Sequence, residues 1–302
     1  MTANAPTQAS VLIELWRGMR PRHWTKNIFI FAPLVFAREL TTTPYLSLVA
    51  MGFVVFCALT SGVYLLNDLV DREKDRAHPV KRHRPIAAGR LSVPMAQVAV
   101  FALTLVALVG AGWLSLRFTY VAVAYLLLNL AYSTWLKRVV IVDVMVVATG
   151  FLLRAWAGAV LIDVKLSHWL LLCTGLVAMF LGFVKRRQEL VALQGMDASD
   201  QRPILREYSL PFLDQMIATV TACTVLAYAL YAFSDEVTAR IGSPWMGATV
   251  PFVLFGIFRY LYLAHQRDQG ENPTEIVTRD AGMVATVILW ALTVLYALYA
   301  GA

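Results

Sequence analysis

Nine apolar runs, most of them about 20 residues long, dominate this sequence of 302 residues. Roughly 20 helical residues cross a hydrocarbon core about 30 Å thick, and backbone groups cannot stay unpaired in lipid. The runs do not alternate between apolar and polar residues, so they predict helices and not barrel strands. Their approximate bounds are 27–37 with an amphipathic start from 11, 44–67, 94–115, 118–136, 139–160, 167–184, 212–233, 243–264 and 282–301. We therefore predict an all-α polytopic membrane bundle of about nine transmembrane helices, forming one domain over residues 1–302.

The composition excludes a water-soluble protein. Only 15% of the residues are charged and 59% are hydrophobic, whereas soluble domains carry about 25% charged residues. The net charge of +7 is therefore interpreted first as a topology signal, and no nucleic-acid partner is expected. The three cysteines all lie inside apolar runs, so we expect them to pack and to form no disulfide: Cys57, Cys173 and Cys223.

The basic residues predict the orientation of the bundle. Twenty of the 26 Lys and Arg residues fall in the N-terminal segment and in alternate loops. The opposite face holds Arg38, Arg117, Lys165 and Arg240, while Arg154 and Arg259 lie within helices. By the positive-inside rule the N-terminus is cytoplasmic and the C-terminus lies outside. The two longest hydrophilic stretches, at about 68–93 and 185–211, are then cytoplasmic, and we expect the chemistry there.

The strongest chemical signal is the run NDLVDREKD at 67–75, at the end of the second predicted helix. If the helix continues, Asn67, Asp71 and Asp75 share one face, with Asp68 beside them. Carboxylates gathered in this way repel one another unless a cation lies between them, and hard oxygen ligands suit Mg²⁺ shared with substrate phosphates. These four residues therefore predict a magnesium and diphosphate site. The alternative is a solvated helix end with interleaved charges.

Several basic clusters are predicted to lie on the same side as the aspartates. The loop at 76–89 contains Arg82 and Arg84 among two prolines and two histidines, and suits phosphate oxygens. Lys26 enters the first helix, and Lys185 and Arg186 follow the sixth. The alternative for each cluster is a positive-inside helix end or contact with anionic lipid.

Two ionisable residues fall within the fifth predicted helix. Asp143 and Arg154 are costly in lipid and should face the bundle interior or a cavity. The sequence leaves two interpretations open for Asp143 and Arg154: they line the substrate cavity, or each pairs with a neighbouring helix for structural reasons.

The acidic run on a nine-helix bundle resembles the UbiA superfamily of intramembrane prenyltransferases. Within that superfamily the chain resembles the decaprenyl-phosphate phosphoribosyltransferase branch. The similarity is carried by RPRHWTKN at 20–27, HPVKRHRPIAAG at 78–89, KRR at 185–187 and REYS at 206–209. The resemblance implies transfer of phosphoribose from 5-phosphoribosyl 1-diphosphate (PRPP) to a polyprenyl phosphate, with release of diphosphate. In actinobacteria such a product leads to lipid-linked arabinofuranose for cell-wall arabinan.

A departure from the wider superfamily favours this branch. Aromatic prenyltransferases carry a second aspartate-rich motif after the sixth helix, but here that position begins with Lys185, Arg186 and Arg187. The pair Asp197 and Asp200 lies farther on and is a weak match. Cations suit a site where two phosphorylated substrates meet.

The mechanism that the resemblance implies assigns a role to each group. Asp68, Asp71 and Asp75, with Asn67, hold Mg²⁺ on the diphosphate of PRPP. The phosphates are neutralised by Lys26, Arg82, Arg84, Lys185 and Arg186, and either Tyr208 or Glu189 orients the ribose or its 5-phosphate. The expected partners are PRPP, a polyprenyl phosphate and the bacterial inner membrane, and the oligomeric state, including a homo-oligomer, stays open. Two alternatives remain, namely prenyl transfer to an aromatic acceptor and a transporter or lipid carrier without enzymatic activity.

Overall fold

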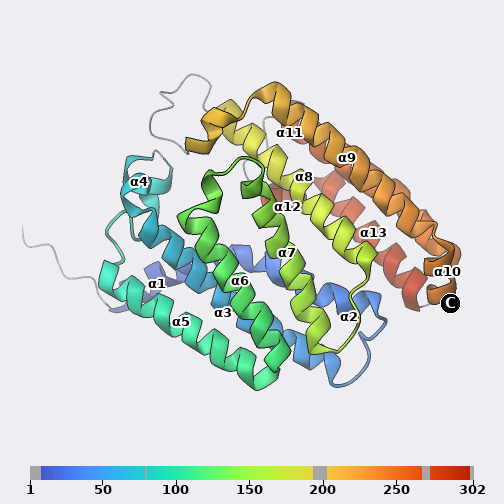
Figure 1. Ribbon diagram of the computed structural model, residues 1–302, viewed down its shortest axis with the longest axis horizontal. Coiled ribbons are helices and arrows are strands. Elements are labelled where there is room, and N and C mark those ends of the chain that lie inside the picture. Colours follow the sequence, from blue (N-terminus) through green and yellow to red (C-terminus); the bar gives the residue numbers. More distant parts are fainter. Residues whose placement is uncertain (1–7, 79, 193–202, 267–272, 300–302) are drawn as a thin grey trace, which may run out of the picture.

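The computed structural model describes residues 8–78, 80–192, 203–266 and 273–299, and within these ranges every regular element is a helix (Figure 1). Eight helices in the described ranges are long and apolar enough to cross a membrane. They are α3 (Tyr45–Val70), α5 (Val93–Leu114), α6 (Leu116–Thr134), α7 (Val142–Leu161), α8 (His168–Ala192), α9 (Leu210–Ala232), η6 continued by α11 (Pro244–Thr249 and Val250–Gln266) and α13 (Ala281–Tyr299). The all-α membrane architecture expected from the apolar runs is confirmed.

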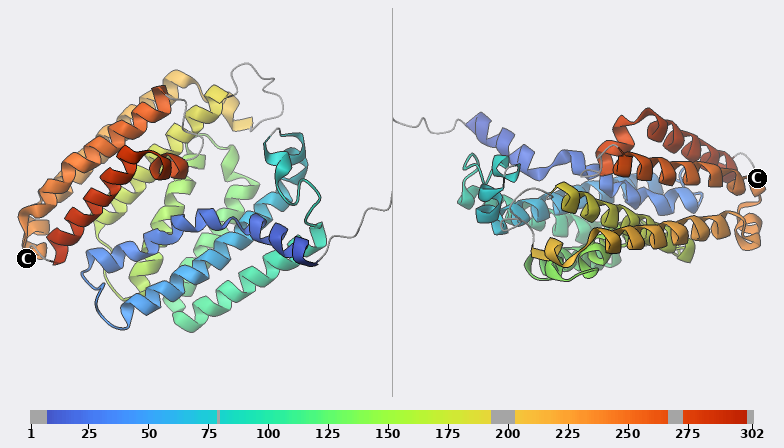
Figure 2. Two further views of the ribbon diagram at one scale, coloured as in Figure 1. Left: turned by 180° about the vertical axis from the view of Figure 1, so that it is seen from behind. Right: turned by 90° about the horizontal axis from the view of Figure 1, so that it is seen from above.

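A ninth segment crosses the bundle with unusual geometry. The 3-10 helix η1 (Pro21–Phe31) continues directly into α2 (Ala32–Phe36). A 3-10 helix rises about 2.0 Å per residue, against about 1.5 Å in an α-helix, so these two elements together extend about 30 Å. The segment begins at Arg20, which contacts Asp68, and ends next to Arg38, which contacts Ile241 at the opposite end of the bundle. Figure 2 shows η1 and α2 running alongside α3.

The remaining described elements are short, apart from the amphipathic α1, and lie towards the ends of the bundle. They are α1 (Gln8–Met19), α4 (Arg72–Ala77), η2 (Lys81–His83), η3 (Leu136–Arg138), η5 (Pro203–Glu207), α10 (Asp235–Ile241) and α12 (Pro273–Arg279). Helix α4 lies at one end of the molecule and α10 at the other (Figure 1). The N-cap Ser209 begins α9 by accepting a hydrogen bond from the Phe212 amide, and Asp280 caps α13 through the Met283 amide.

Helix α7 lies between the two halves of the bundle. It packs against α6 and η1 on one side and against α8 on the other. One core surrounds Phe56 and Phe118 on α3 and α6, and a second surrounds Phe183 and Tyr260 on α8 and α11. This central position brings residues of α7 into contact with both halves.

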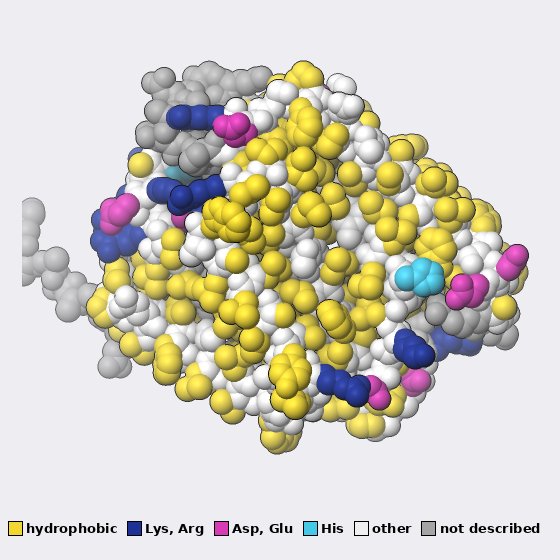
Figure 3. Space-filling view, in the orientation of Figure 1, with side chains coloured by type: hydrophobic (Ala, Val, Ile, Leu, Met, Phe, Trp, Pro, Cys, Tyr) yellow, Lys and Arg dark blue, Asp and Glu magenta, His cyan; other side chains and the backbone are white. Residues whose placement is uncertain are grey.

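The outer surface matches a lipid environment. Figure 3 shows an apolar face, with the charged side chains gathered towards opposite ends. Large apolar residues such as Phe101, Leu127 and Leu226 are exposed on the helix faces. A soluble protein rarely exposes so much contiguous apolar area, so the exposed helix faces are lipid-facing.

Two boundaries differ from the sequence expectation. Helix α8 continues to Ala192, so the KRR motif lies on the last turns of a helix and not in a loop. Helix α3 ends at Val70, and the chain bends at Asp71 before α4 begins. Both changes decide which side chains meet in the site. The rest of the predicted loop at 185–211 is described only from residue 203, so Asp197 and Asp200 lie outside the described residues.

Candidate active site

The acidic run begins on α3 and ends on α4. Hydrogen bonds with helical spacing continue across the bend, from the Asp71 amide to the Asn67 carbonyl and from the Asp75 amide to the Asp71 carbonyl. The four predicted metal ligands divide into two pairs, each with its own hydrogen-bond partners.

The first pair is Asp68 and Asp75, joined by Arg84. One guanidinium nitrogen of Arg84, Nη1, donates to Asp68 Oδ1 at 3.0 Å and to Asp75 Oδ2 at 2.6 Å. Arg20 donates to the same Asp68 oxygen at 2.5 Å. Both carboxylates are buried, with 2% and 4% of their surface exposed. We call Asp68, Asp75 and Arg84 the acidic centre.

The second pair is Asn67 and Asp71, and it faces α6 and η3. The Ser133 hydroxyl donates to the Asn67 side-chain oxygen. Lys137 donates to both carboxylate oxygens of Asp71, at 2.8 and 3.0 Å. The side-chain contacts differ from the expected grouping of Asn67, Asp71 and Asp75 around a common cation: Asp71 pairs with Lys137, whereas Arg84 joins Asp75 to Asp68.

The loop after α4 places Arg84 and turns Arg82 away. Ile86 and Leu91 are buried against Leu65 of α3, and they fix the loop to the end of that helix. Arg84 is held at the acidic centre, whereas Arg82 is exposed and its side chain contacts His83. The loop thus contributes one predicted phosphate-binding arginine to the acidic centre and leaves the other in solvent.

Lys26 lies on η1 at the same end of the bundle. It is half-buried, and the charges of Lys185, Arg154 and Arg20 all act on it. The neighbouring His23 ring has a buried Nδ1 without a hydrogen-bond partner among the described residues. Positive groups from η1, α7 and α8 therefore act together on Lys26, and Arg20 links this set to Asp68 of the acidic centre.

Arg186 and Tyr208 belong to a separate buried cluster around Asp143. Arg186 Nε donates to Asp143 Oδ2 at 2.6 Å, and the Tyr208 hydroxyl donates to Asp143 Oδ1 at 2.7 Å. Arg186 also pairs with Glu189, so all four groups are linked. Burial, together with the Asp143 carboxylate, raises the pKa of Tyr208 well above its usual range. The cluster ties α7, α8 and the segment before α9 together. It leaves Arg186 and Tyr208 hydrogen-bonded to protein groups.

Arg154 occupies the middle of the bundle. Its Nε donates to Asn27 Oδ1, Nη1 to the Gly150 carbonyl and Nη2 to the Tyr125 hydroxyl, each at 2.8 Å. The guanidinium also lies over the rings of Tyr125 and Phe151. The sequence left open whether Asp143 and Arg154 line a cavity or pair with a neighbouring helix. Asp143 pairs with Arg186 of α8, and Arg154 forms hydrogen bonds to η1 and α6.

The donor set fits a magnesium ion only in part. Carboxylate oxygens are the ligands that Mg²⁺ prefers, and two of them face each other across Arg84. In the described ranges, however, no three acidic, histidine or cysteine side chains gather closely enough to hold a metal ion. The residues that fit are Asp68 and Asp75, because Asp71 is turned towards Lys137.

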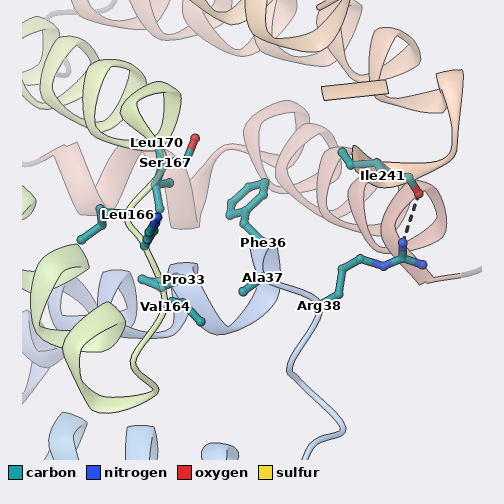
Figure 4. A pocket seen from close by; sticks show the side chains of 10 residues that line it. Pro33, Phe36, Ala37, Arg38, Val164, Leu166, Ser167, Leu170 and Ile241 are labelled. Carbon is teal, nitrogen blue, oxygen red and sulfur yellow. Dashed lines mark hydrogen bonds between the residues drawn. The ribbon is translucent and has the colours of Figure 1, made fainter. Parts of the chain in front are cut away.

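Two cavities lie farther along the bundle. The larger, of about 470 Å³, is lined mainly by apolar residues of η1, α2, α8, α9, α11 and α13, including Ile28, Phe29 and Trp290. The smaller, of about 210 Å³, lies at the end opposite the acidic centre. There Arg38 donates to the Ile241 carbonyl at 3.1 Å (Figure 4).

Some site residues were not predicted as such from the sequence. Lys137 falls among the basic residues that predict the orientation of the bundle, and the sequence does not single out Arg20, Asn27 or Ser133 as site residues. Arg20 adopts a left-handed backbone conformation, with φ of 55°, that turns the chain from α1 into η1. The position of Arg20 beside Pro21 and Arg22 is a signal in the sequence, whereas nothing in the sequence marks Ser133.

The fold and the site together define a polytopic helical membrane protein with buried carboxylates at one end, surrounded by cations. Over residues 28–276 the chain matches the UbiA prenyltransferase family. The protein belongs to this family, and it is therefore an enzyme of the UbiA type.

Curated relatives cover nearly the whole chain. The decaprenyl-phosphate phosphoribosyltransferase of Mycolicibacterium smegmatis is 33% identical over 99% of this chain and 96% of its own length. The protein of the same name from Mycobacterium tuberculosis is 34% identical over 97% of this chain and 98% of its own. A UbiA homolog from Archaeoglobus fulgidus, with GPP and Mg²⁺ bound, superposes with a TM-score of 0.70 at 18% identity, covering 94% of this chain and 98% of the other. This last likeness supports the fold.

Proposed function

We propose that the protein transfers 5-phosphoribose from PRPP to a polyprenyl phosphate such as decaprenyl phosphate and releases diphosphate. The observation that supports this proposal most strongly is the near-full-length similarity to enzymes named for that reaction. The charge of the site agrees with it. Lys26, Lys185 and Arg20 bring positive charge to this end of the bundle, and two phosphorylated substrates require more neutralisation than one prenyl diphosphate.

The acidic centre is the proposed site for the donor diphosphate. Asp68 and Asp75 would hold Mg²⁺, which when bound stabilises the negative charge that grows on the departing diphosphate. Arg84 and Arg20 already lie at these carboxylates and would contact the phosphate oxygens that Mg²⁺ leaves free. We retain Asn67 and Asp71 as residues that position this end of α3, and Lys185 as a phosphate contact.

The transfer step needs few groups from the protein. As the bond from the anomeric carbon to diphosphate breaks, positive charge grows on the sugar and negative charge on the leaving group, so fixed cations around the diphosphate favour that state. A phosphate monoester is already anionic at neutral pH and attacks from the opposite face of the sugar. Inversion at the anomeric carbon is therefore expected, and no general base is required.

The larger cavity suits the isoprenoid chain of the acceptor. Its volume is about 470 Å³, and Ile28 and Phe29 line it on the same element that carries Lys26. An apolar chain placed there would leave its phosphate near the cationic end of the bundle. This arrangement also suits a lipid that remains in the bilayer while its head group reacts.

The location and use of the product follow from the same proposal. The side with most Lys and Arg residues would face the cytoplasm of a bacterium, where PRPP is soluble, with the chain in the inner membrane. The chain would act as one domain, with its chemistry on the segments near 68–93 and 185–211. The product would be a precursor of lipid-linked arabinofuranose for a cell-wall polysaccharide.

The identity of the donor substrate, PRPP or a prenyl diphosphate, distinguishes this function from prenyl transfer. Purified protein is incubated with Mg²⁺ and either PRPP with decaprenyl phosphate or a prenyl diphosphate with an aromatic acid, and lipid products are identified by mass spectrometry. The proposal predicts a phosphoribosylated lipid in the first mixture. No such lipid, with prenylated aromatic product in the second, would support the alternative.

A substitution in the acidic centre distinguishes the two enzymatic functions from a lipid carrier without enzymatic activity. Asp75→Asn should abolish product formation in folded, inserted protein, while Glu73→Gln should not, because Glu73 is exposed on the same short helix. A carrier without enzymatic activity predicts full function for both variants.

A further inference from the structure

Lys26 and Arg154 form a second positive site that the acidic centre does not neutralise. In the described part of the chain, neither residue has a carboxylate within ion-pairing distance. Arg154 is 4% exposed, and all three of its hydrogen-bond acceptors are neutral: an amide oxygen, a backbone carbonyl and a tyrosine hydroxyl. Lys26 precedes Asn27, which accepts from Arg154, and the positive charge of Arg154 acts on Lys26.

Comparison with the other buried cations shows why this is unusual. Arg186 is equally buried but pairs with Asp143, and Lys137 pairs with Asp71. A buried charge without a counter-ion is costly, and more so when a second like charge lies close to it. An anionic ligand placed between Lys26 and Arg154 would remove that cost.

The position of the two cations indicates which anion fits. Asn27, bonded to Arg154, is followed on η1 by Ile28 and Phe29, which line the larger apolar cavity. The Phe29 ring contacts Phe151, with ring centroids 5.1 Å apart, and Phe151 in turn lies 5.4 Å from the Arg154 guanidinium. The cations therefore lie where an apolar cavity approaches the charged end of the bundle.

We propose that Lys26 and Arg154 bind the phosphate of the lipid acceptor, at a subsite distinct from the acidic centre that receives the donor. Asn27 is the positioning residue. Its oxygen accepts from Arg154 Nε, while its amide nitrogen donates to Thr60 Oγ1 and Cys57 Sγ, each at 3.3 Å. The identity of the lipid rests on the proposed function, whereas the anion site rests on the contacts of Lys26, Asn27 and Arg154.

The test compares two lipids that differ only in the phosphate. Binding of decaprenyl phosphate and of decaprenol is measured by native mass spectrometry, without PRPP or Mg²⁺, for the native protein and for Arg154→Met and Asn27→Asp. Asn27→Asp keeps the size of the side chain and supplies the missing counter-ion, so it provides a variant that retains Arg154. Arg117→Met is the control, because Arg117 is an exposed arginine paired with Asp163.

The native protein and the control should bind the phosphate at least about tenfold more tightly than the alcohol. In both test variants this preference should fall to about two- to threefold or less. Binding of the alcohol should stay unchanged, and that result would show that the cavity is intact. A preference that survives in Asn27→Asp, or that is absent in the native protein, overturns the proposal.

Kinetics distinguish a failure of this inference from a failure of the proposed function. If phosphoribose is transferred, Asn27→Asp should raise KM for the polyprenyl phosphate at least about tenfold and change KM for PRPP less than about twofold. Equal changes in both constants would contradict two separate subsites. If the native protein transfers no phosphoribose, the proposed function is wrong, and the binding preference alone decides the present inference.

Discussion

At the acidic centre, Asp68 and Asp75 share one arginine, whereas Asp71 pairs with a lysine from another segment. A guanidinium that bridges two buried carboxylates keeps them close together without a metal ion. Under the proposed function, Asp68 and Asp75 would hold Mg²⁺, and Arg84 would then be free to contact phosphate oxygens of the donor.

Arg84→Met tests this arrangement. Two buried carboxylates lose their shared partner, so the free energy of unfolding should fall by roughly 2–4 kcal/mol without divalent ions. Millimolar Mg²⁺ should raise Tm more in this variant than in the native protein, because the metal replaces the missing charge. The exposed Lys74→Met on α4 is the control. Equal Mg²⁺ effects on all three proteins would show that Asp68 and Asp75 do not hold the ion.

The sequence predicted these carboxylates but not their pairing. Spacing in a straight helix places Asp68, Asp71 and Asp75 on one face, and it does not indicate that Lys137 pairs with Asp71 while Arg84 joins Asp68 to Asp75. It also could not separate Arg82 from Arg84, because the burial of Ile86 and Leu91 decides which arginine points inwards. Such choices depend on tertiary packing, which residue types alone do not specify.

At the scale of elements, the approach of η1 to α7 builds the second positive site. A Cβ atom on Gly158 of α7 would lie 1.9 Å from the Ile30 carbonyl oxygen of η1. Only glycine lets these two backbones come so close, and the same approach brings Asn27 to Arg154, about one turn earlier on α7.

Gly158→Ala should therefore separate η1 from α7. We expect a loss of about 1–3 kcal/mol or more in the free energy of unfolding, and weaker binding of the acceptor phosphate, measured by thermal unfolding and lipid binding. Gly175→Ala on α8 is the control, since its new Cβ would make only ordinary contacts, the nearest at 3.7 Å. Native-like stability in Gly158→Ala would contradict the described packing.

The junction between η3 and α7 depends on Tyr208. Ile141 has a φ of 68°, in the region that favours glycine, and its amide donates to the Tyr208 hydroxyl at 2.7 Å. Tyr208→Phe removes this acceptor and the bond to Asp143, so stability should fall by about 1–3 kcal/mol in chemical unfolding. The exposed Tyr120→Phe should have no measurable effect. If Tyr208 instead contacts substrate, its loss would raise a KM without changing stability.

Most element positions could be predicted from apolar runs, and the exceptions have physical causes. The apolar run at 167–184 ends where charged residues begin. Helix α8 nevertheless continues to Ala192, because Arg186 forms ion pairs with both Asp143 and Glu189. The first run is too short for an α-helical crossing, and hydropathy does not indicate that η1 is stretched into a 3-10 helix.

On the scale of the whole molecule, charges at two ends and an apolar surface between them fix how the bundle lies in a bilayer (Figure 3). The proposed orientation can be measured by cysteine labelling after replacement of the three native cysteines. In intact cells a membrane-impermeant maleimide should label Thr42→Cys, and it should label Ala88→Cys only after lysis. The reverse pattern would place the acidic centre outside the cell and remove its access to PRPP.

The most direct test of the central claim is calorimetric binding of PRPP to the purified protein with and without Mg²⁺, for the native chain and for Asp75→Asn. The account predicts saturable binding that requires Mg²⁺ in the native protein. In Asp75→Asn it predicts binding weakened by at least about tenfold, because one of the two facing carboxylates is gone. Binding of PRPP that is independent of Mg²⁺, or equal in the two proteins, would show that the acidic centre is not the donor site.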